Sequence, residues 1–323
     1  MAVYLGVDAG NSKTVALACD ESGRVCGCGR SGNGDIYGAA SAAAAIDAVA
    51  EAIAGTGVHE FSGAAFRLAG IDWPEDHDLW AQVVADRITV SGRVTIANDG
   101  FAAIRCGEPS GVGVAIVCGT GPAVAARGPE GREWSASFWI QDNIGANSLG
   151  SSALRAVYRA ELGIGPPTAL SAELVKFFEV SDVGELLHFF TRREDSPHWT
   201  APSRAARTIC RLASEGDRVA ADLVHAQALA FADYAAVAAA KAGFAPDGEV
   251  PVVLAGSVLT APDSPLAAEL VAALPERFRH RPALLPPVAG AALDALAEAG
   301  CELDGKVIDT LLRTAPAPEF LRT

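Results

Sequence analysis

The residues with the clearest chemical potential stand near the start of the chain, in the segment Gly6-Val7-Asp8-Ala9-Gly10-Asn11-Ser12-Lys13-Thr14. Apolar runs at 3–7 and 15–19 flank the turn and predict two strands joined by it. Gly10 is expected to turn the backbone with a positive φ and to let amide groups approach a ligand. Ser12, Lys13 and Thr14 add donors, and Asp8 could hold a metal ion through water. We therefore predict a hairpin that binds phosphate oxygens through residues 10–14; a hairpin that binds nothing is the plain alternative.

Two better-known phosphate motifs do not fit this segment. A P-loop needs glycine directly before its Lys-Thr pair and a helix after it, whereas here Ser12 precedes Lys13 and a strand is predicted to follow. The dinucleotide fingerprint G-x-G-x-x-G fails on both its spacing and its following helix. The opening segment is thus a different kind of phosphate turn.

The same pattern returns later in the chain. An apolar run at 112–118 leads into Gly119-Thr120-Gly121 and then into a second apolar run at 123–126. Two such turns that face each other across a cleft could hold one polyphosphate from both sides. A third apolar run, at 250–254, leads into Gly256-Ser257.

A carboxylate follows another predicted strand. The run at 94–97 continues directly into Asn98-Asp99. Catalytic carboxylates commonly lie at the carboxyl ends of strands in α/β sheets. An Asx turn or a helix N-cap is the structural alternative, because Asn and Asp favour both.

Composition limits the classes of protein that fit. The 323 residues suffice for two domains, and half of them are apolar. The net charge of −14 and the absence of a basic stripe argue against nucleic-acid binding and against docking on anionic lipid. Seven scattered cysteines and no basic n-region predict a cytoplasmic protein with reduced thiols.

Periodicity predicts alternating strands and helices over most of the chain. Further strands are expected at 24–29, 64–69 and 283–285, and helices at 41–54, 78–88, 149–162, 171–179, 182–191, 203–215, 217–243 and 288–299. Ser41 is the expected N-cap of the first helix. Charged residues in the Ala-rich stretches around 39–54 and 228–243 argue against membrane spans, and the tail from Cys301 is expected to end in a Pro-rich, frayed segment.

Taken in order, five segments resemble the sugar kinase/Hsp70/actin ATPase superfamily. The resemblance is closer to its N-acetylglucosamine kinase-like branch, within the BadF/BadG/BcrA/BcrD ATPase family, and covers roughly residues 3–300. The segments are Asp8–Thr14 and Cys118–Gly121 (two phosphate motifs), Leu254–Val258 (the adenosine motif), Asn98-Asp99 (the catalytic aspartate motif) and Pro287–Ala291 (a connecting helix).

This resemblance implies an α/β, two-lobed actin-like ATPase (ribonuclease H-like) fold with ATP in the cleft and Mg²⁺ on its phosphates. Residues 1–117, completed by the helix at about 288–300, would form one lobe, residues 118–287 a larger helical lobe, and 301–323 a tail. Asp99 would be the general base, Asp8 the metal-organising residue, and Gly119, Thr120 and Gly121 the second phosphate turn. The remaining implied contacts are Gly256 and Ser257 to adenosine, and Asn33, Gly70, Asn98 and Asp142 to the sugar.

The chain departs from that branch where the family contacts the sugar. Ser135-Ala136-Ser137 and Gln141-Asp142-Asn143-Ile144-Gly145 stand where the branch has Gly-Trp-Gly and Gly-Asp-Glu-Gly-Ser. We therefore expect a kinase of an amino sugar or related sugar, with the particular sugar open. The alternatives are an activator-type ATPase of a 2-hydroxyacyl-CoA dehydratase system and a non-catalytic ATP or sugar sensor. A homodimer is a further possibility.

Overall fold

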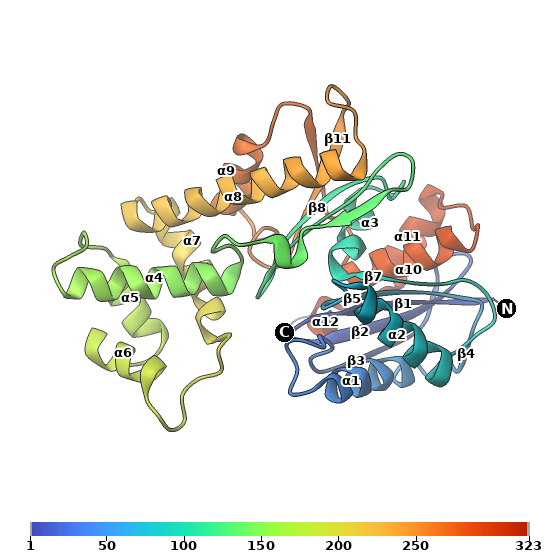
Figure 1. The fold of residues 1–323 in the computed structure, drawn as a ribbon, viewed down its shortest axis with the longest axis horizontal. Helices are drawn as coiled ribbons and strands as arrows, with labels where there is room; N and C mark the ends of the chain where they lie inside the picture. The colour runs from blue at the N-terminus through green and yellow to red at the C-terminus, as the bar shows by residue number, and fades with distance from the viewer. Residues whose placement is uncertain (1, 322–323) are drawn as a thin grey trace.

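Two five-stranded sheets form the framework of the protein. The computed structural model describes residues 2–321. One sheet has the strand order β3-β2-β1-β5-β7 and the other β10-β9-β8-β11-β12, so the two halves repeat one topology (Figure 1). The strands of the first sheet are β1 (Val3–Ala9), β2 (Thr14–Asp20), β3 (Val25–Ser31), β5 (Gly63–Leu68) and β7 (Val94–Asn98). Those of the second are β8 (Gly113–Cys118), β9 (Pro122–Arg127), β10 (Glu133–Ser135), β11 (Val250–Ala255) and β12 (Phe278–Pro282).

The two hairpins expected from the sequence are present. β1 pairs antiparallel with β2, and β8 pairs antiparallel with β9. The inner strands β1 and β8 also pair in parallel with β5 and β11. Strands covered on both faces need continuous apolar runs, which is why these segments stand out in the sequence.

Three helices cover the first sheet: α1 (Ala42–Ala54), α2 (Pro74–Arg87) and α10 (Pro287–Glu298). Ser41 caps α1 by accepting a hydrogen bond from the amide of Ala44, as expected. α10 lies so close to β1 that a Cβ on Gly6 would be 2.3 Å from the backbone nitrogen of Ala292. A helix from the C-terminal part of the chain therefore packs on the first sheet.

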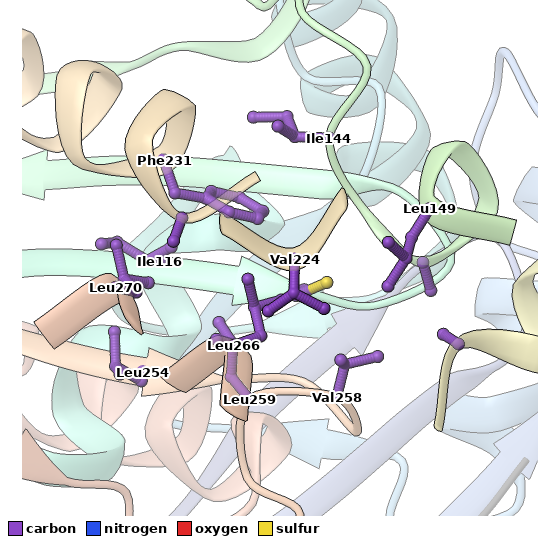
Figure 2. Close-up of a cluster of buried hydrophobic side chains, with 14 of the residues drawn as sticks. Ile116, Ile144, Leu149, Val224, Phe231, Leu254, Val258, Leu259, Leu266 and Leu270 are labelled. Atoms are coloured by element: carbon purple, nitrogen blue, oxygen red, sulfur yellow. The ribbon is translucent and has the colours of Figure 1, made fainter. Parts of the chain in front are cut away.

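The second lobe is richer in helices. They are α4 (Ala146–Glu161), α5 (Leu170–Phe177), α6 (Val183–Thr191), α7 (Ala206–Ser214), α8 (Arg218–Ala242) and α9 (Pro265–Ala273). α8 packs on β9 and β8, and α4 packs on α8. Figure 2 shows Ile144, Leu149 and Val258 entering the same core as Ile116 and Phe231. Because those three residues lie next to loops at the cleft, this core anchors the loops.

α8 is the only helix of residues 2–321 that is long and apolar enough to cross a membrane by length and composition. Within the structure its buried face packs against α7, α9 and β9 instead. That packing agrees with the expectation, based on its charged residues, that this helix does not span a membrane.

A buried ion-pair network joins the two lobes. Asp294 on α10 is fully buried and contacts Arg67 of β5 at 2.8 Å, Arg105 of α3 (Ile104–Gly107) at 2.5 Å and Arg127 of β9 at 3.0 Å. These three guanidinium groups hold the pKa of Asp294 well below its usual range, against the opposing effect of its burial. The network lies where the first sheet, α10 and the second sheet meet.

Several sequence-based boundaries were wrong. The strand expected at 283–285 lies earlier, at 278–282, where it pairs with β11. α2 begins at Pro74 rather than Asp78, because proline fits the first helical position and the Asp76 carboxylate accepts from the amide of Trp73. The tail also contains a helix that was not expected: α11 (Gly305–Thr314) is capped by Asp304 and buries Val307 and Leu311.

The remaining short elements are β4 (Glu60–Phe61), β6 (Thr89–Val90), α12 (Pro318–Leu321) and the 3₁₀ turns η1 (Asp99–Ala103), η2 (Ser137–Trp139) and η3 (Ala201–Ala205). β8 starts at Gly113 and belongs to the second sheet, so that sheet begins ahead of the expected lobe boundary at 117/118. The lobe boundaries themselves stay a prediction.

Candidate functional site

One cavity of about 870 Å³ opens between the two sheets. It brings together fourteen of the sixteen site residues expected from the sequence: Asp8, Gly10, Asn11, Ser12, Lys13, Gly70, Asn98, Asp99, Gly119, Thr120, Gly121, Asp142, Gly256 and Ser257. Thr14 and Asn33 do not line it. Thr14 is fully buried and donates to the carbonyl of Gly32 at 3.0 Å, while the Asn33 side chain accepts from the amide of Asp35 at 2.9 Å. Both residues shape the loops behind the cavity.

The turns at 10–13, 119–121 and 256–257 form what we call the glycine side of the cavity. Gly10 donates to the carbonyl of Lys13 at 2.9 Å, and Gly119 donates to that of Gly121 at 3.1 Å. The Ser12 and Thr120 hydroxyls are 3.0 Å apart, so the two turns meet across the cleft. This is the facing arrangement that the repeated motif suggested.

The glycines of the first two turns leave room for a ligand. A Cβ on Gly10 or Gly119 would meet only a carbonyl oxygen at 3.9 or 3.7 Å, and one on Gly121 would meet nothing within 4 Å. The expected positive φ at Gly10 was wrong, since Gly10 is not among the residues with positive φ. In this structure the missing side chain matters because of the space it leaves.

The N-terminus of α4 adds a feature that the sequence analysis missed. The amides of Ala146 and Asn147 donate to the carbonyls of Gly119 and Thr120, both at 3.0 Å. The positive end of the helix dipole therefore lies against the second turn, where it favours anions. α4 starts at Ala146, earlier than the expected Leu149. Gly145, with φ +93°, is the residue directly before the helix and turns the chain into it.

The Gly256 turn packs against the end of β8. Gly256 has φ +87°, and a Cβ there would be 2.4 Å from the carbonyl oxygen of Cys118. Val258 and Leu259, which follow the turn, are buried in the core shown in Figure 2. Gly256 and Ser257 are thus held at the edge of the cavity by the residues after them.

Asp8 and Lys13 are the charged groups of the glycine side. Burial raises the pKa of Asp8 to about 6, and the nearby Lys13 opposes this shift. Burial lowers the pKa of Lys13, while Asp8 acts in the other direction. No group of three or more His, Cys, Asp or Glu within residues 2–321 forms a ready metal site. A Mg²⁺ ion fits here only as it often does in proteins, on one carboxylate together with substrate phosphates.

Opposite the glycine side, Asp35, Asp72 and Asp99 form what we call the aspartate side. Asn98 accepts from the amide of Gly100 at 3.0 Å, so it caps η1 as the structural alternative proposed. The neighbouring Asp99 carboxylate lines the cavity. Burial raises the pKa of Asp99 to about 8, and the charges of Asp8, Asp35 and Asp72 add to this effect. Such a carboxylate takes up a proton near neutral pH.

Asp35 and Asp72 were missed by the sequence analysis. Asp35 accepts from Asn11 Nδ2 at 2.5 Å and from the amide of Tyr37 at 2.9 Å. Gly70, with φ +80°, makes room for it, since a Cβ there would be 2.7 Å from Asp35 Oδ1. Asp72 accepts from Asn98 Nδ2 at 3.0 Å. Because Asp72 follows β5 as Asp99 follows β7, the rule that strand ends meet could have found it.

Residues of α8 hold the loop that carries Asp142. The Tyr234 hydroxyl donates to Asp142 at 2.8 Å and accepts from the amide of Gln141 at 2.9 Å. The buried Gln227 donates to the carbonyls of Asn143 and Gly145. The departures from the family pattern at 135–145 therefore lie on a loop fixed from behind by a helix.

Comparisons with known proteins agree with this geometry. The chain is 26% identical over 201 residues to an N-acetyl-D-glucosamine kinase of Dictyostelium discoideum, covering 57% of this chain and 63% of that protein. It is 23% identical over 141 residues to an N-acetylmuramic acid/N-acetylglucosamine kinase of Clostridium acetobutylicum, covering 43% of this chain and 46% of that protein. The matches thus span about half to three fifths of these curated relatives.

Solved structures share the fold over nearly the whole chain. A candidate N-acetylglucosamine kinase from Chromobacterium violaceum has a TM-score of 0.65 at 20% identity, covering 92% of this chain and 99% of that one. A ROK family glucokinase from Streptomyces griseus, solved with glucose and AMPPNP, has a TM-score of 0.61 at 19% identity, covering 91% and 98%. These likenesses establish the expected two-lobed actin-like ATPase fold.

The family follows from the sequence itself. The profile of the BadF/BadG/BcrA/BcrD ATPase family matches residues 5–295, which include both sheets and every residue that the sequence analysis placed in the site. The expected family is confirmed, and with it the use of ATP that its description states. This chain belongs to the BadF/BadG/BcrA/BcrD ATPase family.

Proposed function

We propose that this chain transfers the γ-phosphoryl group of ATP to a hydroxyl group of an amino sugar or related sugar. The observation that carries the proposal is the position of Asp99, which lines the same cavity as the turns at 10–13 and 119–121. A carboxylate on the far side of a phosphate-binding cleft is where a kinase needs the base for its acceptor. The names of the two curated relatives add support.

The glycine side serves the nucleotide in this proposal. The open turns at Gly10–Lys13 and Gly119–Gly121 bind the phosphates, and the positive end of the α4 dipole favours the same anions. Gly256 and Ser257 bind adenosine. Asp8 holds Mg²⁺ in contact with the phosphates, where the ion neutralises their charge.

The aspartate side serves the acceptor. Asp99 accepts the proton of the attacking hydroxyl group, and Asn98, Gly70 and Asp142 lie around the sugar. Phosphoryl transfer depends mostly on positioning and on stabilisation of charge, and a positioned base typically contributes ~10²–10⁴-fold in rate. A pKa of about 8 in the ligand-free protein suits such a base, because it is close to the pH at which the proton must move.

The test combines an acceptor panel with one substitution. ADP release with ATP and Mg²⁺ is measured against hexoses, hexosamines and N-acetylhexosamines, and phosphorylated products are identified by mass spectrometry. Asp99→Asn should lower kcat by ~10²–10⁴-fold and leave the Kd for ATP within about threefold. Asp47→Asn, at an exposed position on α1, is the matched control. Full activity of Asp99→Asn would refute Asp99 as the base, and no sugar-dependent ADP release would refute the kinase.

A further inference from the structure

The aspartate side of the cavity is strongly acidic. Five aspartates line the cavity as a whole, and Lys13 is the only Lys, Arg or His lining it among the described residues. Lys13 belongs to the first phosphate turn, next to Asp8. Asp35, Asp72 and Asp99 therefore face the space proposed for the acceptor without a cationic side chain lining the cavity beside them. Burial raises the pKa of Asp99, and the charges of Asp35 and Asp72 raise it further, because the three carboxylates repel one another through this space.

Several side-chain donors of this region already have carboxylate partners. Asn11 Nδ2 donates to Asp35, Asn98 Nδ2 donates to Asp72, and the Tyr37 hydroxyl donates to Asp76 at 2.9 Å. These contacts leave mainly carboxylate oxygen for a ligand, which accepts hydrogen bonds and carries negative charge. Among these side chains, an amide carbonyl on the acceptor could accept only from the second N–H of Asn11 Nδ2 or Asn98 Nδ2. An ammonium group, with three donors and no acceptor, matches them.

Aromatic rings from both lobes close over this region. Tyr37, after β3, lies 5.2 Å from Phe138 of η2, with the two rings nearly perpendicular. Trp73, at the start of α2, stacks on Phe138 at 6.3 Å. Tyr37 and Phe138 line the cavity together with Asp72. Aromatic rings beside carboxylates are a usual environment for organic cations.

The backbone that carries Phe138 is specialised for this contact. Ser137 has φ +44°, a region that residues other than glycine rarely adopt. The Ser137 side chain also lies beside Asp72, whose pKa it lowers against the raising effect of burial. One strained residue thus positions the ring and touches the carboxylate, as is common at functional sites.

We infer that the acceptor carries a free, protonated amine: an unacylated amino sugar whose ammonium group lies at Asp72 against the rings of Tyr37 and Phe138. This inference rests on the proposed function and names the substrate class of the same site. It places the positive charge of the acceptor among carboxylates that otherwise repel. It also excludes anionic acceptors, such as sugars that bear a carboxylate, because they would add a negative charge to an acidic cavity.

Three acceptors that differ at one carbon test the inference. Glucosamine, glucose and N-acetylglucosamine differ in the group at carbon 2, and kcat/KM is measured for each with saturating ATP and Mg²⁺. We expect glucosamine to exceed both others by at least about tenfold, since a charge-assisted hydrogen bond and a cation–π contact are each worth about that much. N-acetylglucosamine equal to or better than glucosamine would overturn the inference and leave the kinase standing. No turnover with any sugar would instead refute the proposed function.

Substitutions identify the residues that recognise the ammonium group of the acceptor. Asp72→Asn should cut the glucosamine-to-glucose ratio of kcat/KM by at least about tenfold, and Phe138→Leu, which keeps apolar volume without a ring, should cut it by about threefold. Trp139→Leu is the matched control, because Trp139 is exposed and does not line the cavity. Glucosamine binding without ATP, measured by calorimetry, should weaken in parallel. If Asp72→Asn instead raises the Mg²⁺ requirement and leaves the ratio unchanged, the carboxylates bind the metal ion and the inference is wrong.

Discussion

The two sides of the cavity are built from different parts of the polypeptide. The glycine side is mostly backbone: two open turns, the N-terminus of α4 and a glycine with positive φ packed on β8, with Asp8 and Lys13 as its charged side chains. The aspartate side is made of side chains, with carboxylates from three loops and a ring, Phe138, contributed by the other lobe. Backbone amides bind any polyphosphate, whereas side chains can be exchanged one at a time. The comparison suggests why a family can keep its nucleotide and change its acceptor.

A substitution that fills the space between the glycine-side turns should give the largest effect on ligand binding. In Gly121→Val the new side chain has space and needs no positive φ, so the fold should tolerate it, but it occupies the cavity between the turns. We expect the Kd for ATP to rise by ~10²-fold or more, because small displacements in such sites cost about that factor. The affinity for the acceptor, measured by calorimetry without ATP, should change little.

Gly305→Val is the matched control for this substitution. Gly305 is exposed at the start of α11, has open space around its Cβ and does not line the cavity. Its valine variant should bind ATP like the wild type. If Gly121→Val weakened acceptor binding as much as ATP binding, the two sides would not be separate sites of recognition.

The contrast also explains what could be predicted from the sequence. Each turn of the glycine side is one continuous segment beside an apolar strand, so Gly10, Lys13, Gly119 and Gly121 could be found from local pattern alone. Asp35 became part of the site through Asn11, Gly70 and Tyr37, which lie in three separate segments. Local pattern therefore favoured its neighbour Asn33, which holds the loop instead.

Other differences have equally physical causes. The ring contact of Phe138 with Tyr37 and Trp73 depends on how the lobes meet, which no segment of sequence specifies. The strand at 278–282 has the sequence Phe-Arg-His-Arg-Pro and lies at a sheet edge, so it lacks the apolar run that marks a buried strand. α11 was missed although its apolar residues Val307, Ile308, Leu311 and Leu312 have helical spacing and Asp304 supplies a recognisable N-cap.

The negative charge of the aspartate side should lower the free energy of unfolding as the pH rises. The pKa of Asp99 is raised from 3.8 to about 8, so the folded protein holds a proton that the unfolded chain releases near pH 4. The proton on Asp99 therefore contributes to the free energy of unfolding in full below about pH 4. This contribution is lost as the pH rises towards 8. Asp99→Asn removes this dependence. The free energy of unfolding of the variant should therefore gain on that of the wild type by at least ~1 kcal/mol between pH 5 and pH 8.5.

Denaturant unfolding in the presence of a chelator measures this difference. Comparing the two proteins at each pH cancels the groups that they share, including Asp8, whose pKa is also raised. Parallel curves for variant and wild type would show that the aspartate side carries no such electrostatic cost.

The smallest effect on activity should come from Tyr234, which supports the loop that carries Asp142 from outside the cavity. Tyr234→Phe removes the hydroxyl group that donates to Asp142 and accepts from the amide of Gln141, and leaves the ring on α8. A hydrogen bond of this kind contributes about 1 kcal/mol, which corresponds to about a fivefold rise in the KM of the acceptor. Because the Tyr234 hydroxyl bonds only to residues 139–142 within the described chain, and not to the glycine-side turns or Asp99, kcat and the Kd for ATP should stay within about twofold. Tyr158→Phe, on α4 in the same lobe, is the matched control, since its hydroxyl contacts only a distant carbonyl at 3.5 Å. A loss in kcat as large as the change in KM would mean that the 141–145 loop positions the reacting groups, and the separation between a fixed nucleotide side and an adjustable acceptor side would fail at this loop.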